Sequence, residues 1–131
     1  MFVEPSVIED LRQSNSGKHD LTKVVRFCEE LNSSFSSGNY LASIFLIRAL
    51  LNHVPPVFGE HEFKQVVSHS TRSVKELLNP LEEIARDVGD LHAHALIRNK
   101  ESIPTKSQVE PFKANLEVLL FEIITRVHKT A

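Results

Sequence analysis

The side chains best suited to chemistry gather in one short stretch of the sequence. Arg86 is followed six residues later by His92 and eight residues later by His94. An arginine can stabilise negative charge and a histidine can move a proton near neutral pH, so an Arg–His active site is one interpretation. On a helix about 120° of rotation separates Arg86 from His92. The pair converges only if the helix bends, for which Gly89 is the natural place, or if a second subunit completes the site.

Two other interpretations explain the same stretch. In the first it is an ordinary amphipathic helix, with His92 at the edge of the core, Asp87, Asp90 and His94 on a solvated face, and Arg86 in weak surface ion pairs. In the second, Asp87, Asp90 and His94 hold a metal ion. No second group at ligand spacing is evident, so we expect neither a metal nor another cofactor. Gly89 can equally mark a close contact with another helix.

The helix that must position these residues has a clear start signal in Asn79-Pro80. Asn79 can cap the helix, and Pro80 suits the first turn because its missing N–H costs nothing there. If the helix runs to about Arg98, it spans roughly 27 Å. Its apolar stripe has helical spacing and predicts a buried face, made of Leu81, Ile84, Val88, Leu91 and Ala95.

A second helix, Asn39–His53, is apolar nearly all round and carries one charge, Arg48. Such a helix is typical of the centre of a bundle or of a subunit interface. Arg48 either pairs with Asp87, Asp90 or Glu122, or extends to the surface along its aliphatic stem. The candidate binding residues are Arg48, Asp87, Asp90 and Arg98; a ligand-binding domain would have Arg48 or Arg98 at the mouth of an apolar pocket.

The remaining segments also have helical periodicity, and no run alternates with the period of a strand. We expect a short helix over Pro5–Gln13, a loop over Ser14–His19, a helix capped by Asp20 that carries Cys28 in the core, and a short helix over Glu60–His69. The last helix should start near Ser107–Pro111, with a capping box between Ser107 and Glu110, and pack antiparallel on the central one. The sequence therefore predicts an all-α antiparallel bundle of five or six helices in one domain, with residues 1–19 as an N-terminal helix and loop and residues 20–131 as the bundle core.

The composition narrows the function. The net charge is −2 with a pI near 6.4, which argues against tight non-specific binding to nucleic acid. One cysteine and no signal peptide fit a cytoplasmic location, and the apolar run Tyr40–Leu51 is too short to span a bilayer. There is no phosphate-binding glycine loop, Rossmann fingerprint or HExxH motif. The chain is either complete or a piece of a longer protein.

The run Gly89-Asp90-Leu91-His92-Ala93-His94, preceded by the Arg48-bearing helix Tyr40–Leu51, resembles the HEPN superfamily, and within it the HEPN-like prokaryotic domains of unknown function. Active members are metal-independent RNases in which an Arg and a His act together, usually in a cleft between two protomers. Two registers fit: Arg86 with His92, or His94 as the family histidine with Gly89 where the catalytic Arg would stand. The second register implies a non-catalytic member.

From the resemblance and the amount of apolar helical surface, we expect a homodimer. The function that we predict is a non-catalytic interaction or binding module of a bacterial defence or regulatory protein, with a protein partner or further domains of a parent protein. The alternative is a metal-independent RNase in which Arg86 polarises the phosphate of an RNA and His92 or His94 moves the proton. An interaction module predicts an exposed apolar patch; an RNase predicts Arg and His facing one cleft.

Overall fold

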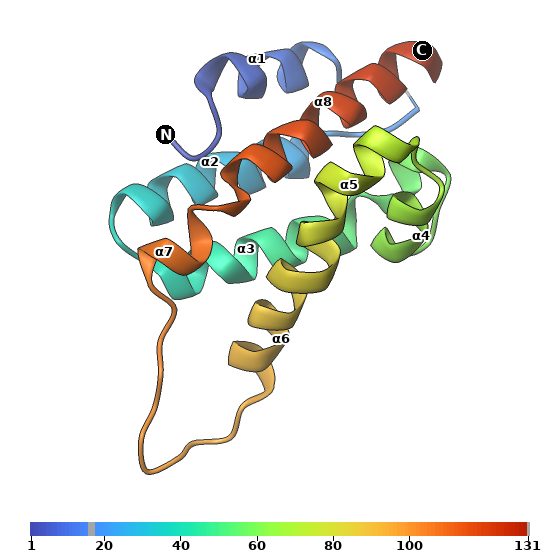
Figure 1. Cartoon of the computed structure of the whole chain (residues 1–131). Helices are drawn as coiled ribbons and strands as arrows, with labels where there is room; N and C mark the ends of the chain where they lie inside the picture. The colour runs from blue at the N-terminus through green and yellow to red at the C-terminus, as the bar shows by residue number, and fades with distance from the viewer. Residues whose placement is uncertain (16–17, 131) are drawn as a thin grey trace.

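The computed structural model describes residues 1–15 and 18–130, and this part of the chain consists of helices and loops with no β-strand (Figure 1). The prediction of an all-α bundle is confirmed. Part of the predicted loop Ser14–His19 lies outside the described residues. The elements in order are α1 (Pro5–Gln13), α2 (Thr22–Ser36), α3 (Tyr40–His53), the 3₁₀ turn η1 (Pro55–Phe58), α4 (Phe63–Ser68), α5 (Arg72–Pro80), the π-helical turn η2 (Leu81–Ala85), α6 (Arg86–His94), α7 (Lys106–Val109) and α8 (Phe112–Thr130).

The core lies between the helix pairs α2–α3 and α5–α8, with α1 packed on α2 and α8 and α6 packed on α3. Its fully buried side chains on α3 and α8 are spaced by three and four residues, as one face of a helix requires: Ile44, Ile47, Leu50 and Leu51 on α3, and Leu116, Leu119, Leu120 and Ile123 on α8. Only one side of α3 is buried in this way, because Leu41 and Ala42 are exposed. The segment Tyr40–Phe58 is long and apolar enough to cross a membrane by length and composition. Part of this segment is buried in the bundle, where α3 packs on α2 and α6 and η1 packs on α8.

The N-terminal segment is held by hydrogen bonds to α2 and to α8. The buried side chain of Asn32 accepts a hydrogen bond from the Val3 backbone N–H (2.6 Å) and donates one to the Val3 carbonyl (2.8 Å). At the other end of α1, Ser14 Oγ lies 3.0 Å from His128 Nε2 of α8. On α2, Cys28 is fully buried, and burial raises the pKa of its thiol to about 12, so it serves the core as predicted.

The central helix begins earlier and ends sooner than its sequence signals indicate. Thr71, not Asn79, precedes its first turn, and Pro80 lies inside the continuous run α5–η2–α6. A proline inside a helix removes one hydrogen bond and crowds the preceding turn. Here the π-helical turn Leu81–Ala85 follows directly, which keeps the buried Leu78 and Leu81 on the core side. The Leu81 N–H bonds the Leu78 carbonyl, and Asn115 Nδ2 of α8 donates to the Leu77 carbonyl (2.7 Å).

Helix α6 ends at His94, four residues before the predicted end at Arg98, since Ala95 is extended (ψ 131°). Residues 95–104, here called the arm, then leave the bundle and return to α7 (Figure 1). Nothing lies beside the arm for Leu96 and Ile97 to pack against, and both are almost fully exposed. An apolar periodicity does not extend a helix that has no core to cover.

The last helix packs as predicted, but the capping box that precedes it is formed by other residues than predicted. The capping box joins Thr105 to Gln108 at the start of α7, not Ser107 to Glu110, and α8 begins at Phe112. Helix α8 then runs antiparallel to α5, so that its last turns lie beside the first turn of α5 (Figure 1). If α5–η2–α6 counts as one helix and the single turn α7 is set aside, the described residues form six helices.

Candidate functional site on the central helix

Arg48 and Gly89 fasten α6 to α3. The Arg48 Nε donates to Asp90 Oδ1 at 2.6 Å, so Asp90 is the partner among the three acidic residues that the sequence offered. The aliphatic stem of Arg48 lies against Gly89, where an added Cβ would come within 2.9 Å of Arg48 Cδ. Gly89 therefore serves a close helix contact, and the irregular turn lies elsewhere, at Leu81–Ala85. Because Arg48 and Asp90 are partly exposed, the pair adds under about 1 kcal/mol to stability.

Arg86 is held in one orientation by two neighbours. Its Nε donates to Glu82 Oε2 at 3.0 Å, one turn earlier on the same helix, and its Nη1 donates to Asn52 Oδ1 of α3 at 2.7 Å. Its side chain is only about one-fifth exposed, at 22%. The guanidinium lines a hollow beside α4, here called the Arg86 hollow. Arg86 therefore forms the ion pair expected of an amphipathic helix, but the pair is largely buried and also reaches α3 through Asn52, so it is not a surface pair.

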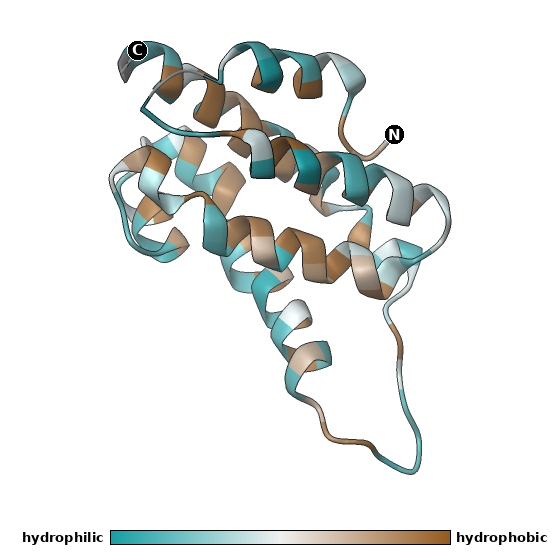
Figure 2. Ribbon diagram, turned by 180° about the vertical axis from the view of Figure 1, so that it is seen from behind, coloured by the Kyte–Doolittle hydropathy of each residue, from teal (hydrophilic) through white to brown (hydrophobic). Residues whose placement is uncertain are grey.

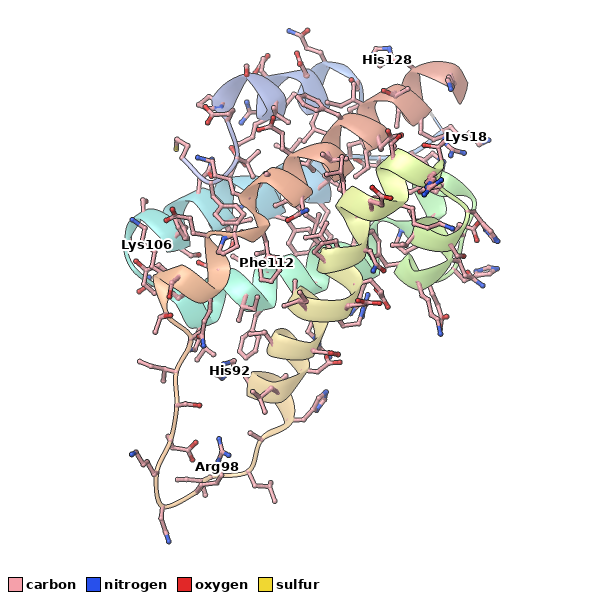
Figure 3. The ribbon with its side chains drawn as sticks, viewed as in Figure 1. Lys18, His92, Arg98, Lys106, Phe112 and His128 are labelled. Atoms are coloured by element: carbon pink, nitrogen blue, oxygen red, sulfur yellow. The ribbon has the colours of Figure 1, made fainter. Side chains whose placement is uncertain are left out.

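His92 faces a different hollow, between α6 and the returning half of the arm (Figure 3). The His92 hollow has a volume of about 210 Å³ and is lined on its apolar side by Leu41 of α3 and Leu91 of α6. Arg98, Glu101 and Ser102 of the arm supply its polar groups. The half-buried imidazole thus lies at the edge of the bundle, where the wheel of the helix places it.

The structure does not bring the predicted catalytic groups together within one chain. Arg86 and His92 line two hollows that share no residue. His94 and Asp87 are exposed on α6. Within residues 1–15 and 18–130 no three His, Cys, Asp or Glu side chains are placed to hold a metal ion, so Asp87, Asp90 and His94 do not form such a group.

Arg98 belongs to the tip of the arm. Its backbone N–H donates to Glu101 Oε1, and its Nε lies 3.9 Å from Glu101 Oε2. These contacts close a turn that reverses the chain. Sequence reasoning placed Arg98 on the helix and therefore missed Glu101 and Ser102 as its neighbours. A stop signal after His94, such as a glycine, would have revealed the turn, but the sequence has none there.

The end of α6 and the arm expose large aliphatic side chains together. We call this set the apolar arm surface; it comprises Leu41 (42% exposed), Leu91 (55%), Leu96 (85%), Ile97 (92%) and Ile103 (74%). Figure 2 shows hydrophobic stretches along both halves of the arm. Single exposed leucines are common on proteins, but a group of aliphatic residues on one projecting segment is typical of an interaction site.

No family model, no curated protein and no solved structure matches the chain.

Proposed function

We propose that the chain is a non-catalytic helical interaction module that pairs with a second copy of itself through the apolar arm surface. The observation that carries this proposal is the exposure of Leu96, Ile97 and Ile103 on an arm that leaves the bundle. Removing apolar surface from water contributes about 25 cal/mol per Å², so an uncovered group of this kind favours association. The interaction module thus has the exposed apolar patch that it requires.

The charges near the arm favour a second copy as the partner. The segment Glu82–Asp90 carries four acidic residues and one arginine, whereas the arm carries Arg98 and Lys100 against Glu101. In a twofold pair the same patch on both copies must be self-complementary. If the arm of each copy crosses α6 of the other, the basic arm meets the acidic flank of α6 twice.

The engagement of Arg86 supports a non-catalytic role. Glu82 and Asn52 hold its guanidinium in the hollow beside α4, which shares no residue with the His92 hollow, so within one chain the two groups do not face a common cleft. The HEPN resemblance, the cytoplasmic location and the setting in a bacterial defence or regulatory protein belong to this proposal as well. In that setting the pair of chains would bring together whatever other domains or proteins each copy carries.

Sedimentation equilibrium of the full chain tests the proposal. We expect the wild type to form dimers and Ile97→Lys to shift the equilibrium at least tenfold toward monomer, because a lysine at the contact must lose its water. Leu77→Lys is the matched control, since Leu77 is also exposed (48%) but lies on α5, away from the arm. Circular dichroism should show the same helix content in all three.

A wild-type chain that stays monomeric up to about 1 mM, a free energy of only about −4 kcal/mol, would overturn the proposal. A dimer that Leu77→Lys weakens as much as Ile97→Lys would place the interface elsewhere and overturn the assignment to the arm.

A further inference from the structure

The Arg86 hollow has the volume and the lining of a small-molecule site. It lies where the end of α3, the segment before α4 and the π-helical turn meet, and holds about 320 Å³. Buried Pro55 and Phe63 form its apolar floor, while His61 and Lys64 stand exposed at its rim. Ligand sites of this kind combine an apolar base with a few polar groups that fix orientation.

We propose that this hollow binds a small organic oxyanion, a phosphate or carboxylate group on a compact flat apolar body. The anionic group would meet Arg86 and Lys64, and the apolar body would rest on Pro55 and Phe63. The hollow and the apolar arm surface share no residue, so separate variants test the two proposals, although the segment Glu82–Asp90 that a partner's arm would meet includes Glu82 and Arg86.

Two cations, Lys64 and Arg86, and two carboxylates, Glu62 and Glu82, line the hollow, so its formal charge is zero and the pairing within it decides what an anion meets. The carboxylate of Glu82 is matched by Arg86, and that of Glu62 accepts the backbone N–H of Gln65 in a capping box. Lys64 has no ion pair among the described residues. An anion that enters the hollow therefore finds one cation that is not yet neutralised and a guanidinium beside it.

Arg86 is also organised in advance to bind. A guanidinium carries five N–H donors, of which Glu82 and Asn52 take one each. With its orientation fixed from two sides, the group loses little further freedom when a ligand arrives. The turn that sets Glu82 and Arg86 on the wall of the hollow is π-helical, an irregularity that is frequent at functional sites.

Titration of the ¹⁵N-labelled full chain, followed by two-dimensional NMR, tests the inference with four probes. Phenyl phosphate and benzoate carry both parts of the proposed ligand, inorganic phosphate lacks the ring, and phenol lacks the charge. We expect saturable shifts at the amides of Phe63, Lys64 and Arg86 with phenyl phosphate or benzoate, and at least tenfold weaker binding of phosphate and phenol. Tighter binding of phenyl phosphate indicates a phosphate ligand, and tighter binding of benzoate indicates a carboxylate.

Matched variants locate the site. Lys64→Gln changes an exposed side chain that makes no ion pair with the described residues, and it should weaken binding several-fold. Arg86→Gln alone would leave Glu82 unpaired and half-buried, so the double variant Glu82→Gln/Arg86→Gln is used; it should weaken binding at least tenfold, as the loss of a hydrogen bond to a charged group predicts. Lys75→Gln on α5 is the control with the same change of charge, because Lys75 is exposed and does not line the hollow, and it should bind like the wild type.

The inference is overturned if neither phenyl phosphate nor benzoate gives saturable shifts, or if phosphate or phenol alone binds as tightly. Equal binding by the wild type, Lys64→Gln and the double variant overturns it as well. None of these outcomes changes the result expected for the arm in sedimentation.

Discussion

Replacing Gly89 by alanine should destabilise the fold, although alanine is the better helix former. At an exposed helix position this change stabilises by about 0.5 to 1 kcal/mol. Gly89 is buried, and the new Cβ would lie 2.9 Å from Cδ and 3.1 Å from Cβ of Arg48. Contacts this short force α6 or Arg48 to move, and such overpacking costs about 1 to 3 kcal/mol. A shifted Arg48 also loses part of its ion pair with Asp90, worth up to about 1 kcal/mol.

Gly89→Ala should therefore lower the free energy of unfolding by about 1 to 2 kcal/mol, because the cost of overpacking is larger than the gain in helix propensity. Urea unfolding monitored by circular dichroism measures it, with an unchanged slope showing that only stability has altered. A double-mutant cycle with Arg48→Ala isolates the contact, because that change removes Cδ and Cγ. In the Arg48→Ala background the cost of Gly89→Ala should fall by about 1 kcal/mol, because the contact with Cδ is gone while the one with the Cβ of residue 48 at 3.1 Å remains. A Gly89→Ala protein as stable as the wild type would refute the reasoning.

Three further outcomes follow from contacts elsewhere in the molecule. Asn32→Ala leaves the N–H and carbonyl of Val3 unpaired, so the free energy of unfolding should fall by about 2 to 3 kcal/mol in urea; a loss below about 0.5 kcal/mol would contradict the role of the clamp. Burial, and then the charge of Lys23, lower the pKa of His53, so the unfolded chain binds this proton more readily and the free energy of unfolding should decrease as pH drops below about 6.5. His53→Gln should reduce that dependence, and an unchanged pH profile in this variant would speak against it. Because Arg86 and His92 line separate hollows, the purified chain should not cleave RNA in EDTA; cleavage lost in Arg86→Ala and in one of His92→Ala or His94→Ala would instead establish the RNase.

The spacing of apolar residues was enough to predict the buried face of a helix where that helix packs on the core. The stripes on α2 and α8 predicted their buried faces, including Cys28, since spacing by three and four is a direct consequence of helix geometry. The partner of Arg48 could be narrowed to three acidic residues but not chosen, because the choice depends on how α6 crosses α3. That crossing is set by Gly89, which lets Arg48 approach closely. The sequence shows that residue 89 lacks a Cβ, but it does not show that Arg48 is its neighbour.

Local signals failed where packing competes with them. Asn79-Pro80 is a good helix start, but continuing the helix through Pro80 buries both Leu78 and Leu81, which outweighs a cap worth about 1 kcal/mol. Residues 95–97 continue an apolar pattern with no surface to cover and leave the helix. The Arg86 hollow was hidden for another reason: His61 and Lys64 come from a segment more than twenty residues before Arg86, and no periodicity links the two.

The contact between α1 and α8 also affects how the chain is made. Ser14 contacts His128, 114 residues later, so α1 cannot complete its packing until α8 has left the ribosome. At about 5 to 20 residues per second this takes roughly 6 to 23 s. Throughout that time the apolar side of α1, with Val7, Ile8 and Leu11, lacks its contact with α8. For most of its synthesis the nascent chain therefore has an N-terminal helix that α2 covers on one side only, and the apolar residues left exposed are a natural target for a chaperone that binds short apolar segments.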